Sequence, residues 1–277
     1  MSLTPDIGAG GGAPGARSAE IHASRAGFLQ DLVSVAIRAL RQIPREPEAI
    51  IPALIIPIFF FVVNVGALGN IAGQVGVSDF RAFQLPVAII FAVTGVSRAS
   101  ALVTDITGGY FDRLLLTPIN RLALLLGLMI ADFALVVALS IPVLLLGFIV
   151  GVDFATGILG LLVFLLIAGF WGLAFTGFPY AIALKTGNPA AVNSSFILFF
   201  PFAFLTTTFL PQEALTGWLS TIADFNPVTY LLEALRSLLS EGWVASSLLK
   251  GLAAIGAVAA LSFSLAMAAL RGRVSRG

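Results

Sequence analysis

The sequence predicts an all-α integral membrane protein with six transmembrane helices. Hydrophobic residues make up 58% of the chain, charged residues only 10%, and the mean hydropathy is +1.03, a composition typical of membrane proteins. Several uncharged runs approach the roughly 20 residues that crossing a bilayer requires. Twelve of the fifteen Lys and Arg residues fall on one side of the predicted arrangement. That side is therefore expected to be cytoplasmic, with both termini on it.

Residues 1–26 are expected to form a disordered cytoplasmic tail, because they are rich in Gly, Ala and Ser and show no periodicity. They contain no apolar run of the kind found in a cleavable signal peptide. The chain has no cysteine, which excludes disulfides and thiol chemistry. The single histidine, His22, lies in this polar tail, so no histidine-based metal or catalytic site is expected.

An amphipathic helix is predicted over Gly27–Ile43, lying along the membrane surface. At about 100° per residue its polar side chains fall in one arc and its apolar side chains fill the other side. Arg38, Arg41 and the following Arg45 place it on the cytoplasmic side. The polar arc comprises Gln30, Asp31, Ser34, Arg38, Arg41 and Gln42.

One transmembrane domain is predicted over residues 27–270, followed by a short cytoplasmic tail at 271–277. Asn64, in the first span, is expected to hydrogen-bond to a neighbouring helix. Arg98 and Asp132 carry charges inside spans, where an unpaired charge is costly. They are predicted to form an ion pair; alternatively, Arg98 reaches the inner headgroups. The six predicted spans are 49–68, 82–104, 122–150, 156–184, 189–210 and 251–270.

The polar loop between the second and third spans, residues 105–121, predicts a short helix that another protein could push. Gly108 and Gly109 should end the incoming helix. Tyr110–Leu116 can then form about two helical turns, with Asp112 facing water and Phe111 facing an apolar surface. Pro118 begins the next helix, after Thr117 as its N-cap.

Residues 212–247 are too polar to span a membrane and too apolar for a free loop. They predict two short helices in the outer leaflet, Gln212–Asp224 and Pro227–Ser240, with Asn226 capping the second. Glu233 and Arg236 are three residues apart and could pair on one helix face.

Two motifs resemble the permease subunit of the ABC-2 family of ATP-binding-cassette transporters. The first, G-x-(Y/F)-x-R-L-L-x-(S/T)-P-x-x-R, begins at Gly109, and the second, N-P-(V/L)-T-Y-x-x-E-A-x-R, begins at Asn226. Within this family the chain is similar to daunorubicin-resistance-type drug exporter permeases over about residues 27–270. It departs from the family where Ile106-Thr107-Gly108 replaces a charged pair that often precedes Gly109.

The resemblance implies a transport subunit that is not itself an enzyme and that works with a separate ATPase chain binding ATP and Mg²⁺. In agreement, the sequence contains no G-x-x-x-x-G-K-(S/T) motif. A second permease, either another copy or a related chain, is implied as well; nucleic acid is not an expected partner, and no cofactor or metal is expected on this chain. The residues expected to couple to the ATPase are Gly109, Tyr110, Phe111, Asp112, Arg113, Leu114 and Arg121, with Arg38 and Arg41 of the surface helix.

The expected function is outward transport of a hydrophobic or amphiphilic substrate, a drug or a lipid, by a permease in the cell membrane. The fifth predicted span is crowded with Phe residues, which offer broad apolar contact. Export of a polysaccharide or glycolipid is the alternative, and a secondary transporter is a weaker one, because only Arg98 and Asp132 could couple ions. The expected substrate path and outer gate comprise Phe199, Phe200, Thr206, Thr207, Asn226, Pro227, Tyr230, Glu233 and Arg236.

Overall fold

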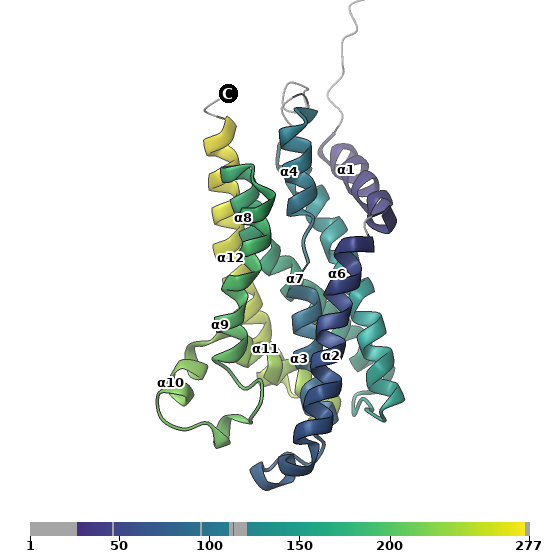
Figure 1. Ribbon diagram of the computed structural model, residues 1–277, viewed down its shortest axis with the longest axis vertical. Coiled ribbons are helices and arrows are strands. Elements are labelled where there is room, and N and C mark those ends of the chain that lie inside the picture. The colour runs from purple at the N-terminus through teal and green to yellow at the C-terminus, as the bar shows by residue number, and fades with distance from the viewer. Residues whose placement is uncertain (1–26, 46, 95, 111–112, 114–120, 275–277) are drawn as a thin grey trace, which may run out of the picture.

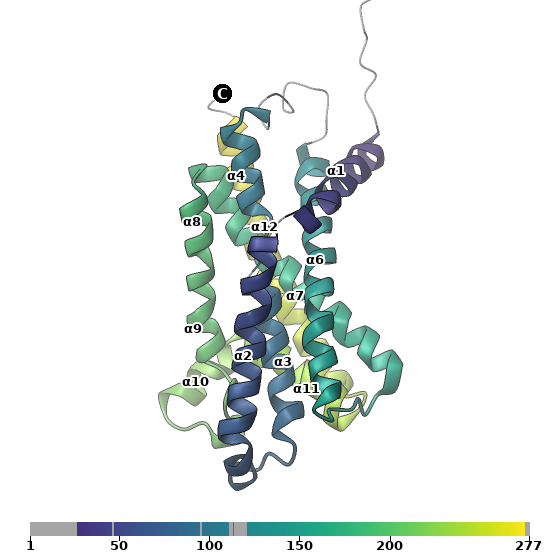
Figure 2. The ribbon, with the colours of Figure 1, turned by 45° about the vertical axis from the view of Figure 1, so that its right-hand side comes forward.

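The computed structural model describes residues 27–45, 47–94, 96–110, 113 and 121–274, and the regular secondary structure of this part of the chain is helical. Most of the long helices run along the long axis of the molecule (Figure 1), while α1 lies obliquely at one end (Figure 2). The principal helices are α1 (Phe28–Gln42), α2 (Pro47–Ala72), α3 (Phe80–Thr94), α4 (Ala99–Thr107), α6 (Arg121–Ile149), α7 (Gly157–Thr186), α8 (Pro189–Ser194), α9 (Phe199–Phe204), α10 (Trp218–Phe225), α11 (Pro227–Arg236) and α12 (Ala245–Val274).

Within the described residues, five stretches are long and apolar enough to cross a membrane: 50–70, 80–107, 122–149, 157–186 and 245–273. The chain is therefore a multi-pass membrane protein, as its composition predicts. The first, third and fourth spans occur close to their predicted bounds, as α2, α6 and α7. The last, α12, begins at Ala245 rather than at Gly251.

The prediction of a continuous fifth span over 189–210 is wrong. The chain there forms α8, a 3₁₀ turn η3 (Ser195–Leu198) and α9, and helix ends at Phe204. This apolar segment is shorter than the roughly 20 residues needed to cross. Pro201 has no N–H to donate to Ile197 and its ring crowds the Ile197 carbonyl, which disfavours regular α-helix in the turn before it, where η3 lies.

The second span is divided, although the sequence predicts one helix over 82–104. α3 ends at Thr94 and α4 begins at Ala99. The break is stabilised by side chains that accept the freed backbone N–H groups, as a membrane interior requires. Asp132 Oδ1 accepts from the Arg98 N–H at 2.8 Å, and Ser97 Oγ accepts from the Ala99 N–H at 3.1 Å.

Helix α1 has the predicted length, but its predicted polar arc is not all exposed. Asp31 is buried with Val35 and Ala39 against α6, whereas Leu29 and Val33 are exposed. The close approach is possible because α6 has Gly127 at the contact, where a Cβ atom would come within 2.8 Å of Val35 Cβ. The surface helix is thus anchored to the bundle by one edge.

Two further expectations need correction. Asn64 does not bond to a neighbouring helix through its Nδ2 group, which donates instead to the Phe60 carbonyl one turn earlier, at 2.7 Å.

The segment 212–224 is not one helix, because Gly217 has a φ of +63° and separates a 3₁₀ turn, η4 (Gln212–Ala214), from α10. Helix α11 ends at Arg236 and continues as a π-helical turn, η5 (Ser237–Glu241).

The main hydrophobic core surrounds α3. Its Ala88, Ile89 and Ala92 are completely buried, and α2, α6, α7 and α11 all contact the helix. Trp171 of α7 is buried beside it and donates its indole N–H to Thr94 Oγ1 at 3.0 Å. Helices α3 and α4 together connect the two ends of the molecule, where the candidate functional residues lie.

Candidate functional site

At the end of the molecule that carries α1, an ion pair connects α1 to α4. Arg38 Nη2 lies 2.8 Å from Asp105 Oδ2, and both side chains are partly exposed. The Arg38 guanidinium also lies over the Tyr110 ring, 4.8 Å from its centroid, a cation–π contact. The structure thus brings together two predicted coupling residues, Arg38 and Tyr110. Asp105 was not among those residues, although it begins the polar loop.

The chain leaves α4 as the two glycines predict. Gly109 has a φ of +70°, a conformation that glycine adopts without steric cost. The Arg113 N–H donates to the Gly109 carbonyl at 3.2 Å, and Arg113 and Arg41 are both exposed. Three predicted coupling residues, Phe111, Asp112 and Leu114, and most of the predicted helix Tyr110–Leu116, lie outside the described residues. Arg121 begins α6, and its side chain is likewise not described.

A second connection joins the C-terminal end of α1 to the break between α3 and α4. Arg98 Nη2 donates to Gln42 Oε1 at 2.9 Å, while the Arg98 backbone N–H donates to Asp132 Oδ1. Arg98 and Asp132 are 3% and 0% exposed, so these contacts offset a large desolvation cost. The two residues of the predicted ion pair are thus brought together by the Arg98 backbone N–H, while an ion pair between their side chains stays a prediction. Tyr180 of α7 is buried next to the Asp132 carboxyl group.

At the opposite end, Asn226 connects α9 to α11. Its Nδ2 group donates to the carbonyls of Phe202 and Leu205 at 2.7 and 2.8 Å. Its Oδ1 accepts from the Val228 N–H, so it caps α11 as predicted, with Pro227 in the first turn. One amide side chain thus holds the end of the broken fifth segment to the start of α11.

A pair of threonines strengthens this α9–α11 connection. The Thr206 and Thr229 hydroxyls are 2.5 Å apart and buried. Two other predicted gate residues lie on α9. Phe199 is buried in the core, whereas Phe200 is exposed and stacks on Phe204.

Arg236 connects α11 to two other parts of the chain. Its Nη1 and Nη2 donate to the hydroxyl and carbonyl of Thr207 at 3.0 and 2.8 Å, and Nε donates to the Phe83 carbonyl at 3.1 Å. The guanidinium also lies 3.5 Å from the centre of the Phe83 ring. Burial lowers the pKa of Arg236 to about 9, so the side chain stays charged at neutral pH.

The predicted Glu233–Arg236 pair is wrong. Glu233 Oε1 instead accepts from Ser247 Oγ of α12 at 2.9 Å. Glu233 thus bonds to Ser247, and Arg236 bonds to Thr207 and Phe83. These partners lie on different segments, distant in the sequence from α11.

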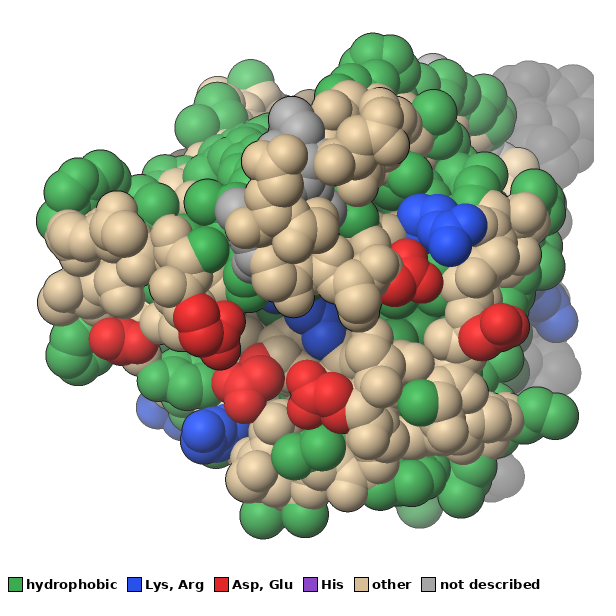
Figure 3. Space-filling model, turned by 90° about the horizontal axis from the view of Figure 1, so that it is seen from below, with side chains coloured by type: hydrophobic (Ala, Val, Ile, Leu, Met, Phe, Trp, Pro, Cys, Tyr) green, Lys and Arg blue, Asp and Glu red, His purple; other side chains and the backbone are tan. Residues whose placement is uncertain are grey.

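A pocket of about 600 Å³ opens at this end of the molecule, the end that the sequence predicts to face outward, and we call it the outer pocket. Four predicted gate residues line it, namely Thr207, Tyr230, Glu233 and Arg236, whereas Phe199, Phe200, Thr206, Asn226 and Pro227 do not. Figure 3 shows acidic side chains gathered around a hollow on this face. The charged side chains that line the pocket are Asp79, Glu213, Asp224, Glu233 and Glu241, with Arg236 and Lys250.

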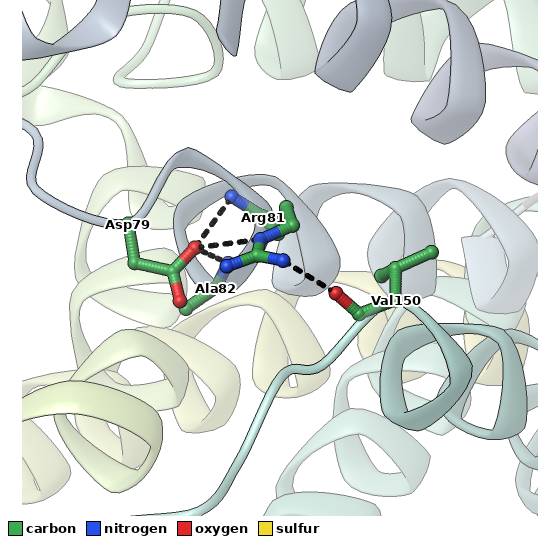
Figure 4. A network of polar contacts seen from close by, with 4 residues as sticks. All are labelled: Asp79, Arg81, Ala82 and Val150. Atoms are coloured by element: carbon green, nitrogen blue, oxygen red, sulfur yellow. Dashed lines mark hydrogen bonds and ion pairs between the residues drawn. The ribbon is translucent and has the colours of Figure 1, made fainter.

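Asp79 lines one edge of this pocket and also holds the start of α3 in place. Asp79 Oδ1 accepts from the N–H groups of Arg81 and Ala82 at the start of α3, and Arg81 Nη1 donates to the Val150 carbonyl at 2.7 Å (Figure 4). These contacts hold the start of α3 to the end of α6. Among the described residues, no group of three or more His, Asp or Glu side chains could hold a metal ion.

Comparisons with known proteins agree with the two sequence motifs. A family model described as ABC-2 type transporter matches residues 30–240. A daunorubicin resistance ABC transporter permease protein of Streptomyces coeruleorubidus is 28% identical over 206 residues, which cover 73% of this chain and 72% of the relative. A protein of Mycobacterium tuberculosis named as a probable doxorubicin resistance permease is 25% identical over 214 residues, covering 76% of this chain and 78% of the relative. The chain belongs to the ABC-2 type transporter family, and it is a membrane permease component without a nucleotide-binding domain of its own.

Proposed function

We propose that this permease exports a hydrophobic or amphiphilic substrate, a drug or a lipid, using ATP hydrolysed by a separate ATPase subunit. The observation that carries the proposal is the joining of α1 to α4 by Arg38, Asp105 and Tyr110, next to the polar loop. A push on the loop from an ATPase would be transmitted to both helices together.

The orientation proposed puts α1, the polar loop and both termini in the cytoplasm. Arg38, Arg41, Lys185, Arg271 and Arg273 are positioned at that end, which agrees with the positive-inside rule. The outer pocket, with its excess of acidic residues, would then face the exterior. The ATPase would dock against the loop from Gly109 to Arg121 and against the exposed Arg41.

The route of the motion would run from α1 to the middle of the membrane. Gln42 at the end of α1 holds the Arg98 side chain, and the Arg98 backbone is held by Asp132 of α6. Because helix α3–α4 is broken at this point, α4 could tilt while α3 stays packed in the core, with the Arg38–Asp105 pair linking α4 to α1. Such a hinge would convert an inner push into an opening between helices.

The substrate would leave near the outer pocket. Asn226, Thr206 and Arg236 hold α9 and the following residues to α11, so these contacts would have to loosen or move together when a path opens. The Phe residues of α9 offer an apolar wall nearer the middle of the membrane, while the outer pocket offers Tyr230 and several carboxylates. An amphiphile, and particularly one with a polar or positively charged group, would match both surfaces. The names of the two relatives also point to drug export.

The active assembly proposed has two permeases, either two copies or this chain with a related one, and two ATPase subunits. Helix α2 presents exposed Ile51, Ile55 and Phe59, which could face the second permease or lipid.

The test is to find whether an ATP-binding-cassette ATPase is encoded beside the gene of this chain, and to reconstitute the two together in vesicles. Hydrophobic dyes, lipids and sugars are then compared for stimulation of ATP hydrolysis and for transport. Stimulation by amphiphiles is the expected result. Stimulation only by a hydrophilic polymer or an inorganic ion would reject the substrate class, and no hydrolysis with any neighbouring ATPase would reject the transporter itself.

A further inference from the structure

A groove of about 950 Å³ lies between α7 and α12 toward the end where both helices terminate. We call it the α7–α12 groove. Its walls carry small or apolar side chains such as Ala181, Ile182 and Ala269, and Leu198 of η3 closes one side. Figure 1 shows α8 beside the upper half of α12, where this groove lies. The groove is therefore bordered by α7, α12 and η3.

The charge in the α7–α12 groove has one sign. Lys185 lies in the last turn of α7 and Arg273 in the last turn of α12, and both line the groove. Within the part of the chain that the structure describes, no Asp or Glu lines the groove. A ligand whose charged group is negative would therefore match this end of the groove.

The groove is also deep along the helix axes. Phe178 lies seven residues before Lys185 and Leu265 lies eight before Arg273, which places the apolar floor about 10 Å from the charged end at about 1.5 Å per residue. A small soluble anion would use the charged end alone and leave the apolar floor in contact with water. A ligand with an anionic head and an acyl chain would fill both.

We propose that the α7–α12 groove binds one phospholipid of the adjoining leaflet, with an anionic headgroup at Lys185 and Arg273. Basic pockets between transmembrane helices are suited to anionic lipid headgroups, because each nearby cation adds attraction. The lipid is present at high local concentration at this depth, and its chain would replace the missing side-chain volume beside Ala181 and Ala269. This binding does not depend on the export activity proposed above.

The simpler explanation for the two cations is that they lie at helix C-termini, where positive side chains are favoured by the helix dipole. That explanation predicts a contribution of Lys185 and Arg273 to stability, but no preference for one lipid over another. It also predicts the same behaviour for Arg271, which lies in the same last turn, is exposed and does not line the groove. Arg271 is therefore the matched control.

The experiment is native mass spectrometry of the full-length chain in detergent, titrated with phosphatidylglycerol or with phosphatidylcholine of the same acyl chains. The chain should retain phosphatidylglycerol in preference. The Lys185→Gln/Arg273→Gln variant should bind phosphatidylglycerol about 25-fold more weakly, at about fivefold for each cation, and should bind phosphatidylcholine as before. Arg271→Gln should leave both affinities within about twofold.

A second variant, Ala269→Leu, keeps both cations and fills part of the groove, so it should weaken retention of both lipids. It keeps the proposal testable if the double variant does not fold. Equal retention of the two lipids by the unaltered chain, or an equal loss in Arg271→Gln, would overturn the proposal. So would a shift from dimer to monomer in Ala269→Leu with lipid retention unchanged, because the groove would then hold a second copy of the chain.

Discussion

Arg38 and Asp105 are 67 residues apart in the sequence, yet their side chains meet at 2.8 Å. This contact links the surface helix α1 to α4, the second half of the divided second span. Because the two side chains are 31% and 24% exposed, the pair should contribute little to stability, about 0–1 kcal/mol. We expect the pair to transmit motion between α1 and α4 rather than to stabilise the fold.

The first prediction follows from that difference. Arg38→Ala should lower transport per ATP hydrolysed while changing the unfolding temperature little, because a partly exposed pair is worth less than about 1 kcal/mol. Transport and hydrolysis are measured together in reconstituted vesicles. The swapped variant Arg38→Asp/Asp105→Arg should recover part of the coupling. Arg271→Ala, an exposed cation at the same end, is the control, and equal loss in that variant would show a general charge effect.

The second prediction concerns the polar loop. The double substitution Phe111→Ala/Arg113→Ala should weaken co-purification with the ATPase or uncouple hydrolysis from export, because it removes an apolar and a charged contact together. Thr104→Ala, on the exposed side of α4, should leave both properties unchanged. Normal coupling in the double variant would remove the loop from the docking surface.

The third prediction separates the charge of Asp132 from its hydrogen bond. Asp132→Leu should destabilise the protein by about 3 kcal/mol or more, since it leaves the Arg98 N–H without its acceptor and removes a buried carboxylate beside a cation. Asp132→Asn keeps the acceptor oxygen and should cost clearly less. Thermal unfolding in detergent, followed by tryptophan fluorescence, compares the two. Equal losses would mean that the charge, rather than the backbone contact, stabilises this site.

The fourth prediction tests the connection between α9 and α11. Asn226→Asp keeps the cap on the Val228 N–H but loses both donations to the Phe202 and Leu205 carbonyls, so it should cost at least about 2 kcal/mol. Asn188 offers a matched control, because it caps α8 through the Ala190 N–H. Asn188→Asp should change stability little, since Asp is an equally good cap.

Thermal unfolding also measures the Asn226 and Asn188 variants. If Asn226→Asp is as mild as Asn188→Asp, the two carbonyl contacts do not hold α9 in place. The outer gate would then have to be sought elsewhere, beginning with the contacts of Arg236 to Thr207.

Local features of the sequence determined the long helices, the bounds of α1 and the turn at Gly109. Apolar runs and helical periodicity are patterns within one continuous segment, so they can be identified without knowing what packs against that segment. The cap at Asn226 is local for the same reason: its acceptor and the Val228 N–H are two residues apart. The two family motifs were equally readable, because they are patterns of neighbouring residues.

Only the tertiary structure decided where helices break and which polar residues pair. The break between α3 and α4 is stable because Asp132 from another helix accepts the Arg98 N–H. Glu233 and Arg236 have the spacing of an ion pair, yet Ser247 and Thr207 reach them from distant segments. Asp31 looks like part of a polar face, and it is buried because Gly127 of α6 lets α1 approach closely. In each case the competing partner is remote in the sequence, and in a membrane interior a buried polar group is satisfied by whichever partner packing brings within reach.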